Sequence, residues 1–284
     1  MSCDLRFDSP GWRCPRCSWQ PVTHRFILFA SDRSDSDLGF PSESFQRLAK
    51  LEPTSFWFRT RNRVVMQLLV QSFPKAESLL ELGCGTGFVL SGLSRALPNL
   101  ALSGSELHED ALDFAASRLP GVTLYQMDCR HIPFESEFDV ICAFDVLEHV
   151  EEDSVALSEM FKAVKPGGGV LISVPQHPWL WSAGDSFAHH QRRYRRRELE
   201  VKLRGTGFHI VRVTSFVFLL LPLMAVSRVF QRDRTTYDPS AEYRAPRAID
   251  RTLEAVCEAD RWLIARGFSL PAGGSLFVVA RKPA

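Results

Sequence analysis

A glycine-rich stretch decides the fold of this chain: residues 81–87 read ELGCGTG. The largely apolar run 78–82 is typical of a short buried strand, and residues 87–97 predict a helix that Pro98 ends. Glycines let the backbone turn tightly beside a ligand, and the free N–H groups at a helix start bind polar or anionic groups. The stretch therefore predicts a strand, a turn and a helix that together hold a ligand.

The spacing of the glycines separates several nucleotide-binding classes. A dinucleotide dehydrogenase carries G-x-G-x-x-G, whereas this chain has Gly83, Gly85 and Gly87, with Phe88 where a dehydrogenase has its third glycine. A phosphate-binding P-loop needs Gly-Lys-Ser/Thr, and the sequence contains no such triplet. Both classes are therefore disfavoured.

Strands and helices alternate outward from this stretch. Strands are expected at residues 100–105, 122–127, 138–144 and 170–174, with helices at 108–119 and 153–164 between them. This alternation is typical of a parallel sheet covered on both faces, an α/β fold. Two more strands are expected at 208–215 and 275–281, and between them lie an apolar helix near 219–230 and an amphipathic helix at 248–266.

Composition excludes several function classes. The chain has 284 residues, with 34 Lys and Arg against 33 Asp and Glu, so a basic nucleic-acid-binding surface is not expected. The longest apolar run, 216–226, contains Pro222 and is too short to span a bilayer. The N-terminus lacks a signal-peptide pattern, and the 7 cysteines are odd in number and scattered. We therefore expect a reduced, cytoplasmic protein.

Five segments in order resemble the motifs of class I S-adenosylmethionine-dependent methyltransferases. Residues 81–87 resemble the first motif, and the others lie at 104–106, 126–129, 138–149 and 165–168. The resemblance implies a Rossmann-like, seven-stranded sheet with helices on both faces and a helical cap inserted between the last two strands. It divides the chain into a Cys-containing segment (1–37), an N-terminal helical cap (38–75), a cofactor-binding core (76–215), a helical insert (216–269) and a last core strand (270–284).

The same resemblance assigns the cofactor site. Glu106 matches the acid that binds the ribose hydroxyls, since one carboxylate can accept from both, and Asp128 matches the acid that binds the adenine amino group. The residues expected to bind S-adenosyl-L-methionine are Glu81, Gly83, Cys84, Gly85, Gly87, Glu106, Leu107, Asp128, Cys129 and Phe144.

The loop after residue 175 is rich in Trp and His and resembles the substrate-side loop of type 11 and type 12 methyltransferases. A histidine that titrates near neutral pH is a suitable base for a hydroxyl or amine nucleophile. The candidate catalytic residues are His190, His189 and His149, and the candidate substrate-binding residues are Trp57, His177, Trp179, Trp181 and Tyr194. The alternative is that these histidines cap helices or stack on Trp.

Two groups of residues suggest metal binding. Cys14 and Cys17 have zinc-knuckle spacing and Cys3 lies upstream, which resembles a degenerate zinc ribbon, because Arg6 replaces the partner expected after Cys3. These three cysteines are candidate metal ligands, and a relic with free thiols is the alternative. The order of Asp145, Glu148 and His149 resembles quinone-pathway O-methyltransferases that hold a divalent ion. The same pattern is widespread in the family without any metal, and the favoured reading is that His149 serves as a hydrogen-bonding group at a helix start.

The expected function is methyl transfer from S-adenosyl-L-methionine to a small, hydrophobic or aromatic acceptor, with no nucleic-acid partner. An RNA or protein methyltransferase that uses the Cys knuckle and the Arg-rich run 192–197 is the main alternative, and a partner protein without turnover is another. The apolar stretch 219–230 reads as core, as a cap over a greasy acceptor, or as a point of peripheral membrane contact.

Overall fold

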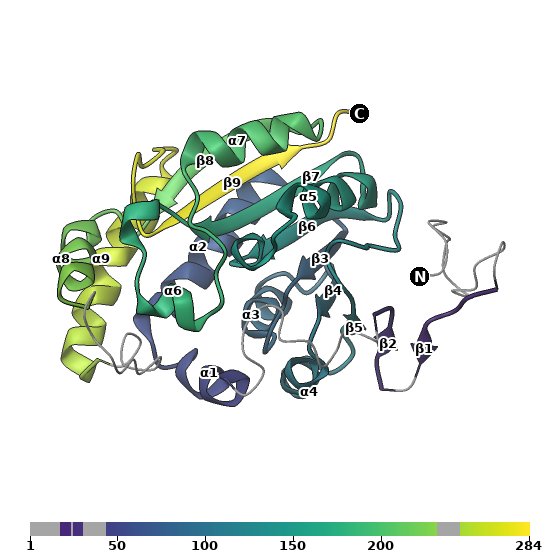
Figure 1. Ribbon diagram of the computed structural model, residues 1–284, viewed down its shortest axis with the longest axis horizontal. Helices are drawn as coiled ribbons and strands as arrows, with labels where there is room; N and C mark the ends of the chain where they lie inside the picture. Colours follow the sequence, from purple (N-terminus) through teal and green to yellow (C-terminus); the bar gives the residue numbers. More distant parts are fainter. Residues whose placement is uncertain (1–17, 24, 31–43, 232–244) are drawn as a thin grey trace.

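The computed structural model describes residues 18–23, 25–30, 44–231 and 245–284. Its centre is a nine-stranded sheet in the order β1-β2-β5-β4-β3-β6-β7-β9-β8 (Figure 1). The strands are β1 (Val22–Thr23), β2 (Ile27–Leu28), β3 (Ser78–Leu82), β4 (Ala101–Glu106), β5 (Thr123–Gln126), β6 (Phe138–Phe144), β7 (Val164–Pro175), β8 (His209–Phe216) and β9 (Ser275–Arg281).

The central strands are parallel, so their carboxyl ends meet at one edge. From β2 to β7 every neighbouring pair is parallel, and β9 runs antiparallel between β7 and β8. The chain adds β4 and β5 on one side of β3 and then crosses to add β6 on the other. In open α/β sheets the crevice at such a reversal of strand order is where ligands bind.

The expected count of seven strands is wrong for this sheet, because two strands of two residues each extend one edge. Ile27 of β2 pairs in parallel with Tyr125 of β5, and the Phe29 N–H donates to the Gln126 carbonyl at 2.8 Å. Strands this short show no alternating apolar pattern, so the sequence could not reveal them. The strands β3 to β9 correspond to the seven that the sequence predicted.

Helices cover both faces of the sheet. The α-helices are α1 (Phe45–Leu51), α2 (Phe56–Ser72), α3 (Phe88–Ala96), α4 (Glu109–Arg118), α5 (Asp153–Ala163), α6 (Ala183–Phe187), α7 (Arg196–Gly205), α8 (Leu221–Gln231) and α9 (Arg247–Ala265). Buried side chains of α2, α3, α4 and α9 belong to one apolar cluster, and those of α5 and α7 to a second on the opposite face. Strand side chains alternate between these clusters: Cys142 of β6 lies in the first, and Ile141 and Ala143 lie in the second.

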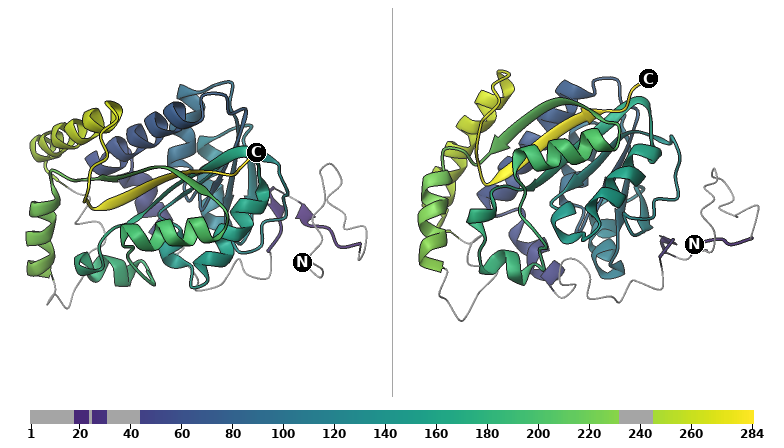
Figure 2. Two further views of the ribbon diagram at one scale, coloured as in Figure 1. Left: turned by 90° about the horizontal axis from the view of Figure 1, so that it is seen from above. Right: turned by 45° about the horizontal axis from the view of Figure 1, so that its top comes forward.

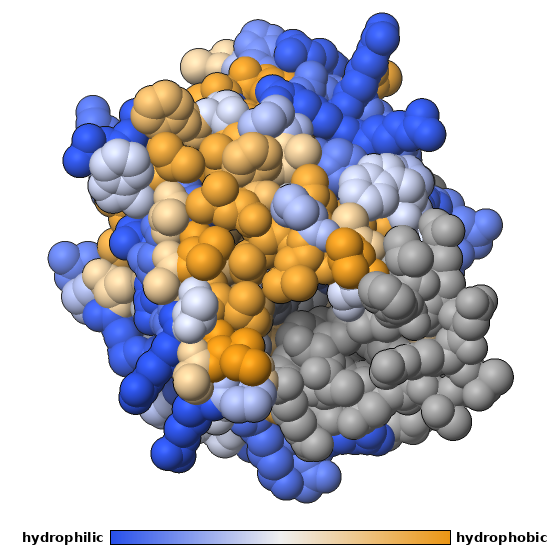
Figure 3. Space-filling model, turned by 90° about the vertical axis from the view of Figure 1, so that its left-hand side faces the viewer, coloured by the Kyte–Doolittle hydropathy of each residue, from blue (hydrophilic) through white to orange (hydrophobic). Residues whose placement is uncertain are grey.

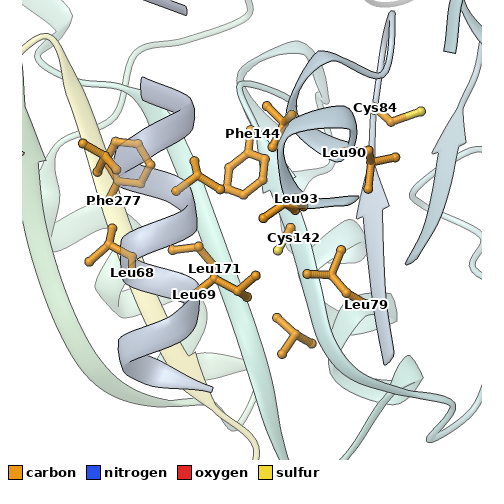
Figure 4. Close-up of a cluster of buried hydrophobic side chains, with 14 of the residues drawn as sticks. Leu68, Leu69, Leu79, Cys84, Leu90, Leu93, Cys142, Phe144, Leu171 and Phe277 are labelled. Carbon is orange, nitrogen blue, oxygen red and sulfur yellow. The ribbon is translucent and has the colours of Figure 1, made fainter. Parts of the chain in front are cut away.

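The first cluster fixes α2 against the sheet. Leu68 and Leu69 of α2 lie near Phe277 of β9 and Leu171 of β7 (Figure 4). All four side chains are at most 2% exposed. A fully buried Leu or Phe contributes about 1.5–3 kcal/mol of apolar burial, so this contact holds the carboxyl-terminal part of α2 against the sheet.

The two helices α8 and α9 lie between β8 and β9 in the chain, where the sequence predicted two helices. Figure 2 shows α9 beside α2. Arg59 of α2 pairs with Asp250 at 2.6 Å, and Arg63 pairs with Glu258 at 2.8 Å. The buried Asp260 accepts from the Phe218 N–H at 2.6 Å, which ties the entry to α8 onto α9.

Within the described residues, no helix combines the length and apolarity that crossing a membrane requires.

Candidate functional site

A cavity of about 740 Å³ lies at the carboxyl ends of the parallel strands. Each of the five central strands contributes a residue at or just beyond its end: Glu81, Glu106, Met127, Phe144 and Pro175. Residues of α1, α2, α6 and α8 also line the cavity. The cavity therefore gathers segments that are far apart in the sequence, and its volume is within the range typical of small-molecule sites.

The glycine turn forms one wall of the cavity, in a backbone conformation that suits glycine. Gly83, Gly85 and Gly87 have φ of 62°, 51° and 74°, in the left-handed region. A Cβ on Gly83 would lie 2.5 Å from the Val146 side chain. The three glycines thus bring the backbone close to the cavity while β3 and α3 stay packed.

Glu106 at the end of β4 lies against this turn. Its Oε2 accepts from the Gly85 N–H at 3.1 Å, and its Oε1 accepts from the Leu107 N–H at 2.7 Å. These two hydrogen bonds hold the carboxylate in place, and both Glu106 and Leu107, which the sequence singled out, line the cavity.

Asp128 carries a partner that sequence reasoning missed. The Arg130 guanidinium donates to the Asp128 carboxylate at 2.8 and 3.1 Å and also pairs with Glu152 at 2.8 Å. The adjacent Cys129 also lines the cavity, and burial raises the pKa of its thiol to about 12. An uncharged thiol is a poor nucleophile, so Cys129 supplies shape to the site.

Glu81 at the end of β3 is the most perturbed acid of the turn. Burial raises its pKa to about 8, with Arg61 opposing this shift and Glu52 and Glu106 adding to it. Its Oε2 has no hydrogen-bond partner among the described residues. Burial also holds the pKa of the neighbouring Cys84 thiol well above its usual range. Glu81 therefore lines the cavity with a buried carboxyl, one oxygen of which no described residue satisfies.

Arg61 of α2 is a further residue that the sequence did not indicate. Its side chain is 8% exposed and pairs with Asp145 at 2.5 Å. Its guanidinium lies over the Trp57 ring at 5.0 Å and near Phe144 at 5.7 Å. The i, i+4 spacing of Trp57 and Arg61 on a helix was the available signal, but the pairing with Asp145 needs the folded chain.

Two of the three candidate catalytic histidines reach the cavity. His149 and His190 line it, and their ring centroids are 4.7 Å apart. The His190 Nδ1 lies 2.9 Å from the Asp185 carboxylate. His189 is exposed, has a φ of 56° and is not among the lining residues of the cavity.

Of the candidate substrate-binding residues, Trp57 alone is among the residues that line the cavity. Trp57 lines the cavity, whereas His177, Trp179 and Trp181 do not, and Trp179 is 52% exposed. Tyr194 is fully buried, and its hydroxyl donates to Asp153 at 2.6 Å. The backbone pairing of Gln176 with Tyr194 closes the loop at its base.

The structure describes the arginine-rich run 192–197 but not the predicted zinc ligands. Cys3, Cys14 and Cys17 lie outside the described residues. In the run 192–197, Arg193 is buried on Asp185 at 2.8 Å, and Arg192 donates to the Val150 carbonyl at 2.9 Å. These two arginines therefore tie loops together.

Comparison with known proteins links this geometry to methyl transfer. Residues 79–168 match the family model described as a methyltransferase domain. A dTDP-3-amino-3,4,6-trideoxy-alpha-D-glucopyranose N,N-dimethyltransferase of Streptomyces venezuelae is 32% identical over 40% of this chain and 48% of its own. A demethylmenaquinone methyltransferase of Staphylococcus aureus is 31% identical over 49% of this chain and 58% of its own. The chain thus spans about half the length of the curated relatives it matches.

Solved structures support the fold. Haemonchus contortus phosphoethanolamine N-methyltransferase 2, in complex with S-adenosyl-L-methionine, aligns with a TM-score of 0.52 at 22% identity, covering 78% of this chain and 53% of that chain. Streptomyces venezuelae DesVI aligns with a TM-score of 0.54 at 17% identity, covering 86% of this chain and 99% of that chain. The mixed α/β fold around a central sheet is therefore shared with methyltransferases.

Proposed function

We propose that this protein is a class I S-adenosylmethionine-dependent methyltransferase that acts on a small, apolar acceptor. One observation carries the proposal: the glycine turn, Glu106, Asp128 and the segment after β6 converge on one cavity at the carboxyl ends of parallel strands. Those are the segments that the resemblance assigns to the cofactor, and residues 79–168 carry the family match.

The residues present suit the cofactor. Glu106 would bind the ribose hydroxyls, and Asp128 with Cys129 would border the adenine. Glu81 lines the cavity, and its unpartnered oxygen would accept from the cofactor's ammonium group, which would also return the charge that burial disfavours. When bound, the cofactor supplies an electrophilic methyl group, and the chain contributes positioning and exclusion of water.

The acceptor would occupy the part of the cavity beyond the strand ends. Apolar side chains from several helices line this part, among them Trp57, Phe187, Leu223 and Met224. His149 and His190 line it too and are the polar groups that we place nearest the acceptor. Apolar walls with a few convergent polar groups are the usual pattern of a small-molecule site.

The outer surface of α8 supports an apolar acceptor. Leu223 lines the cavity and yet is 58% exposed, and Leu219 and Val226 are about as exposed. Figure 3 shows apolar residues gathered on this side of the molecule. We propose that α8 and α9 cap the site and that an apolar acceptor enters along α8, the same surface on which peripheral membrane contact would take place.

Calorimetry with S-adenosylhomocysteine tests the proposal. Glu106→Ala should weaken binding by about 5- to 150-fold, because the lost hydrogen bonds to a charged group contribute about 1–3 kcal/mol. Glu135→Ala, at an exposed glutamate away from the cavity, is the matched control. Equal affinities for both variants would remove Glu106 from the site, and binding of NAD in place of S-adenosylhomocysteine would overturn the proposed class.

A methyl-transfer assay identifies the acceptor class. Labelled S-adenosyl-L-methionine is incubated with the protein and a cell extract, and the label is followed into organic-soluble, RNA and protein fractions. We expect the label in small apolar molecules. Label confined to RNA or protein would favour the alternative of a macromolecular methyltransferase.

A further inference from the structure

The helix α8 is apolar around its whole circumference, yet the protein does not enclose it. Residues 221–231 read LPLMAVSRVFQ, with Arg228 as the single charged side chain. None of the α8 side chains that the structure describes is buried. A helix that is apolar all round normally lies in a protein core or in a membrane, so α8 calls for an apolar partner.

Two stripes of side chains along this segment have different surroundings. One stripe lines the cavity and consists of Leu220, Met224 and Ser227. The second stripe follows the spacing i, i+4 and i+7 and consists of Leu219, Leu223 and Val226, which are 46%, 58% and 53% exposed. Because Leu223 also lines the cavity, the exposed stripe continues into the cavity wall.

The fold presents α8 from a fixed base. The buried Asp260 of α9 accepts from the Phe218 N–H at 2.6 Å and from the Leu219 N–H at 3.3 Å. Further along, Met224 packs so closely on Gly274 that a Cβ there would lie 2.6 Å from its methyl carbon. The exposure of the second stripe therefore follows from how the fold holds α8.

A partly exposed tryptophan lies next to the same cavity. Trp181 is 37% exposed and directly precedes Ser182, which lines the cavity. Its indole Nε1 donates to the Ser186 hydroxyl at 3.2 Å. Figures 1 and 2 show the segment between β7 and α6 at the same end of the molecule as α8. Tryptophan is enriched where a membrane meets water, because its ring is apolar and its N–H is polar.

The two segments that carry these side chains are basic, although the whole chain has a formal charge of only +1. Residues 176–197 and 219–231 together contain 6 arginines and a single acid, Asp185, which is buried. Arg195 and Arg197 are exposed and form no ion pair with any described residue. This end of the molecule therefore combines apolar side chains with unpaired positive charge.

That combination favours one kind of partner. In a two-fold symmetric contact with a second copy the same surface meets itself, so the arginines of both copies would repel one another. RNA binds arginines along its phosphate backbone, and exposed leucines would contribute little to such a contact. An anionic lipid bilayer offers an apolar interior for the exposed stripe and negative headgroups for the arginines.

We infer that α8 and the segment 178–181 dock onto an anionic lipid bilayer, with Leu219, Leu223 and Val226 inserted among the lipids. The contact is peripheral, since α8 has 11 residues and a span needs about 20. Arg195 and Arg197 lie at the level of the headgroups in this arrangement.

This inference deepens the proposed function, on which its role rests. An apolar acceptor dissolved in the bilayer would reach the cavity past Leu223 without crossing water. The acceptor class is thereby narrowed to lipid-soluble molecules that reside in a membrane.

Cosedimentation of the full chain with lipid vesicles tests the docking. Vesicles of phosphatidylglycerol and phosphatidylcholine in equal parts are compared with vesicles of phosphatidylcholine alone. We expect binding to the anionic vesicles and at least about tenfold weaker binding to the neutral ones. The double variant Leu219→Gln, Val226→Gln should weaken binding at least about tenfold, and Arg195→Gln, Arg197→Gln up to about 30-fold.

A matched control changes two exposed valines elsewhere. Val70→Gln with Val211→Gln, on α2 and β8, alters residues that are 48% and 53% exposed and do not line the cavity, and it should bind vesicles like the wild type. Leu219 and Val226 do not line the cavity either, so S-adenosylhomocysteine binding measured by calorimetry should be unchanged in both double variants and reports on folding.

Three results would overturn the inference. They are absence of binding to anionic vesicles, equal binding to both kinds of vesicle, and equal loss of binding in the Leu219, Val226 variant and in the valine control. A dimer in solution that Leu219→Gln, Val226→Gln dissolves, without vesicle binding, would assign the surface to a second copy and also overturn it. Cofactor binding without vesicle binding would leave the proposed function standing, and vesicle binding without cofactor binding would remove the proposed function alone.

Discussion

Replacing Glu81 by glutamine should remove the contribution of this carboxyl to the pH dependence of stability. Burial raises the pKa of this carboxyl from its usual 4.5 to about 8 in the cofactor-free protein. Between these two pH values the folded protein keeps a proton that the unfolded chain releases. The free energy of unfolding therefore falls as pH rises from about 4.5 to about 8 and levels off above that.

The magnitude follows from the width of this window. Each pH unit between the two pKa values lowers the free energy of unfolding by about 1.4 kcal/mol. The total loss between pH 4.5 and pH 8 is therefore about 5 kcal/mol as an upper limit. The attraction of Arg61 for the ionised form is already included in the shifted value. Glutamine carries no charge at any pH, so Glu81→Gln should match the wild type near pH 4.5 and exceed its stability by about 2–5 kcal/mol at pH 8.

Urea denaturation of the cofactor-free proteins at intervals from pH 4.5 to 9 measures this difference. Subtracting the wild-type profile from the variant profile cancels the contribution of titrating groups that do not interact with Glu81. Glu135→Gln, at an exposed position, is the control and should parallel the wild type. If the Glu81→Gln difference changes by less than about 1 kcal/mol across the range, then burial does not control the ionisation of Glu81 and the argument is wrong.

Two further predictions concern the turn and the tryptophans. Gly83→Ala should lower the free energy of unfolding by about 1–3 kcal/mol more than Gly121→Ala does, as measured by urea denaturation. Both residues have positive φ, but only at Gly83 would a Cβ lie 2.5 Å from Val146. Equal losses would contradict a steric role for Gly83. Trp57→Ala should reduce methyl-transfer efficiency on the acceptor about tenfold, since Trp57 lines the cavity, whereas Trp179→Ala should leave it unchanged; a larger effect of Trp179 would place the acceptor outside the cavity.

The sequence by itself determined the α/β alternation and the segments expected to hold the cofactor. Each of these signals is local: the glycines of 81–87 prescribe a turn between a strand and a helix, and Glu106 and Asp128 stand at or just after strand ends. Parallel strands place their carboxyl ends at one edge of a sheet. Local patterns were therefore enough to predict that these residues share a site, and the structure brings them to one cavity.

Only the tertiary structure decided which partners these residues have. Arg61 reaches Asp145 from a helix more than eighty residues earlier, and the rings of His149 and His190 lie 4.7 Å apart although two α-helices and a strand separate them in the chain. The resemblance of its loop to type 11 and type 12 methyltransferases placed Trp179 at the acceptor, yet Trp179 is exposed and does not line the cavity. Such contacts depend on how whole elements pack against one another, so they cannot be predicted from a residue's neighbours in the sequence.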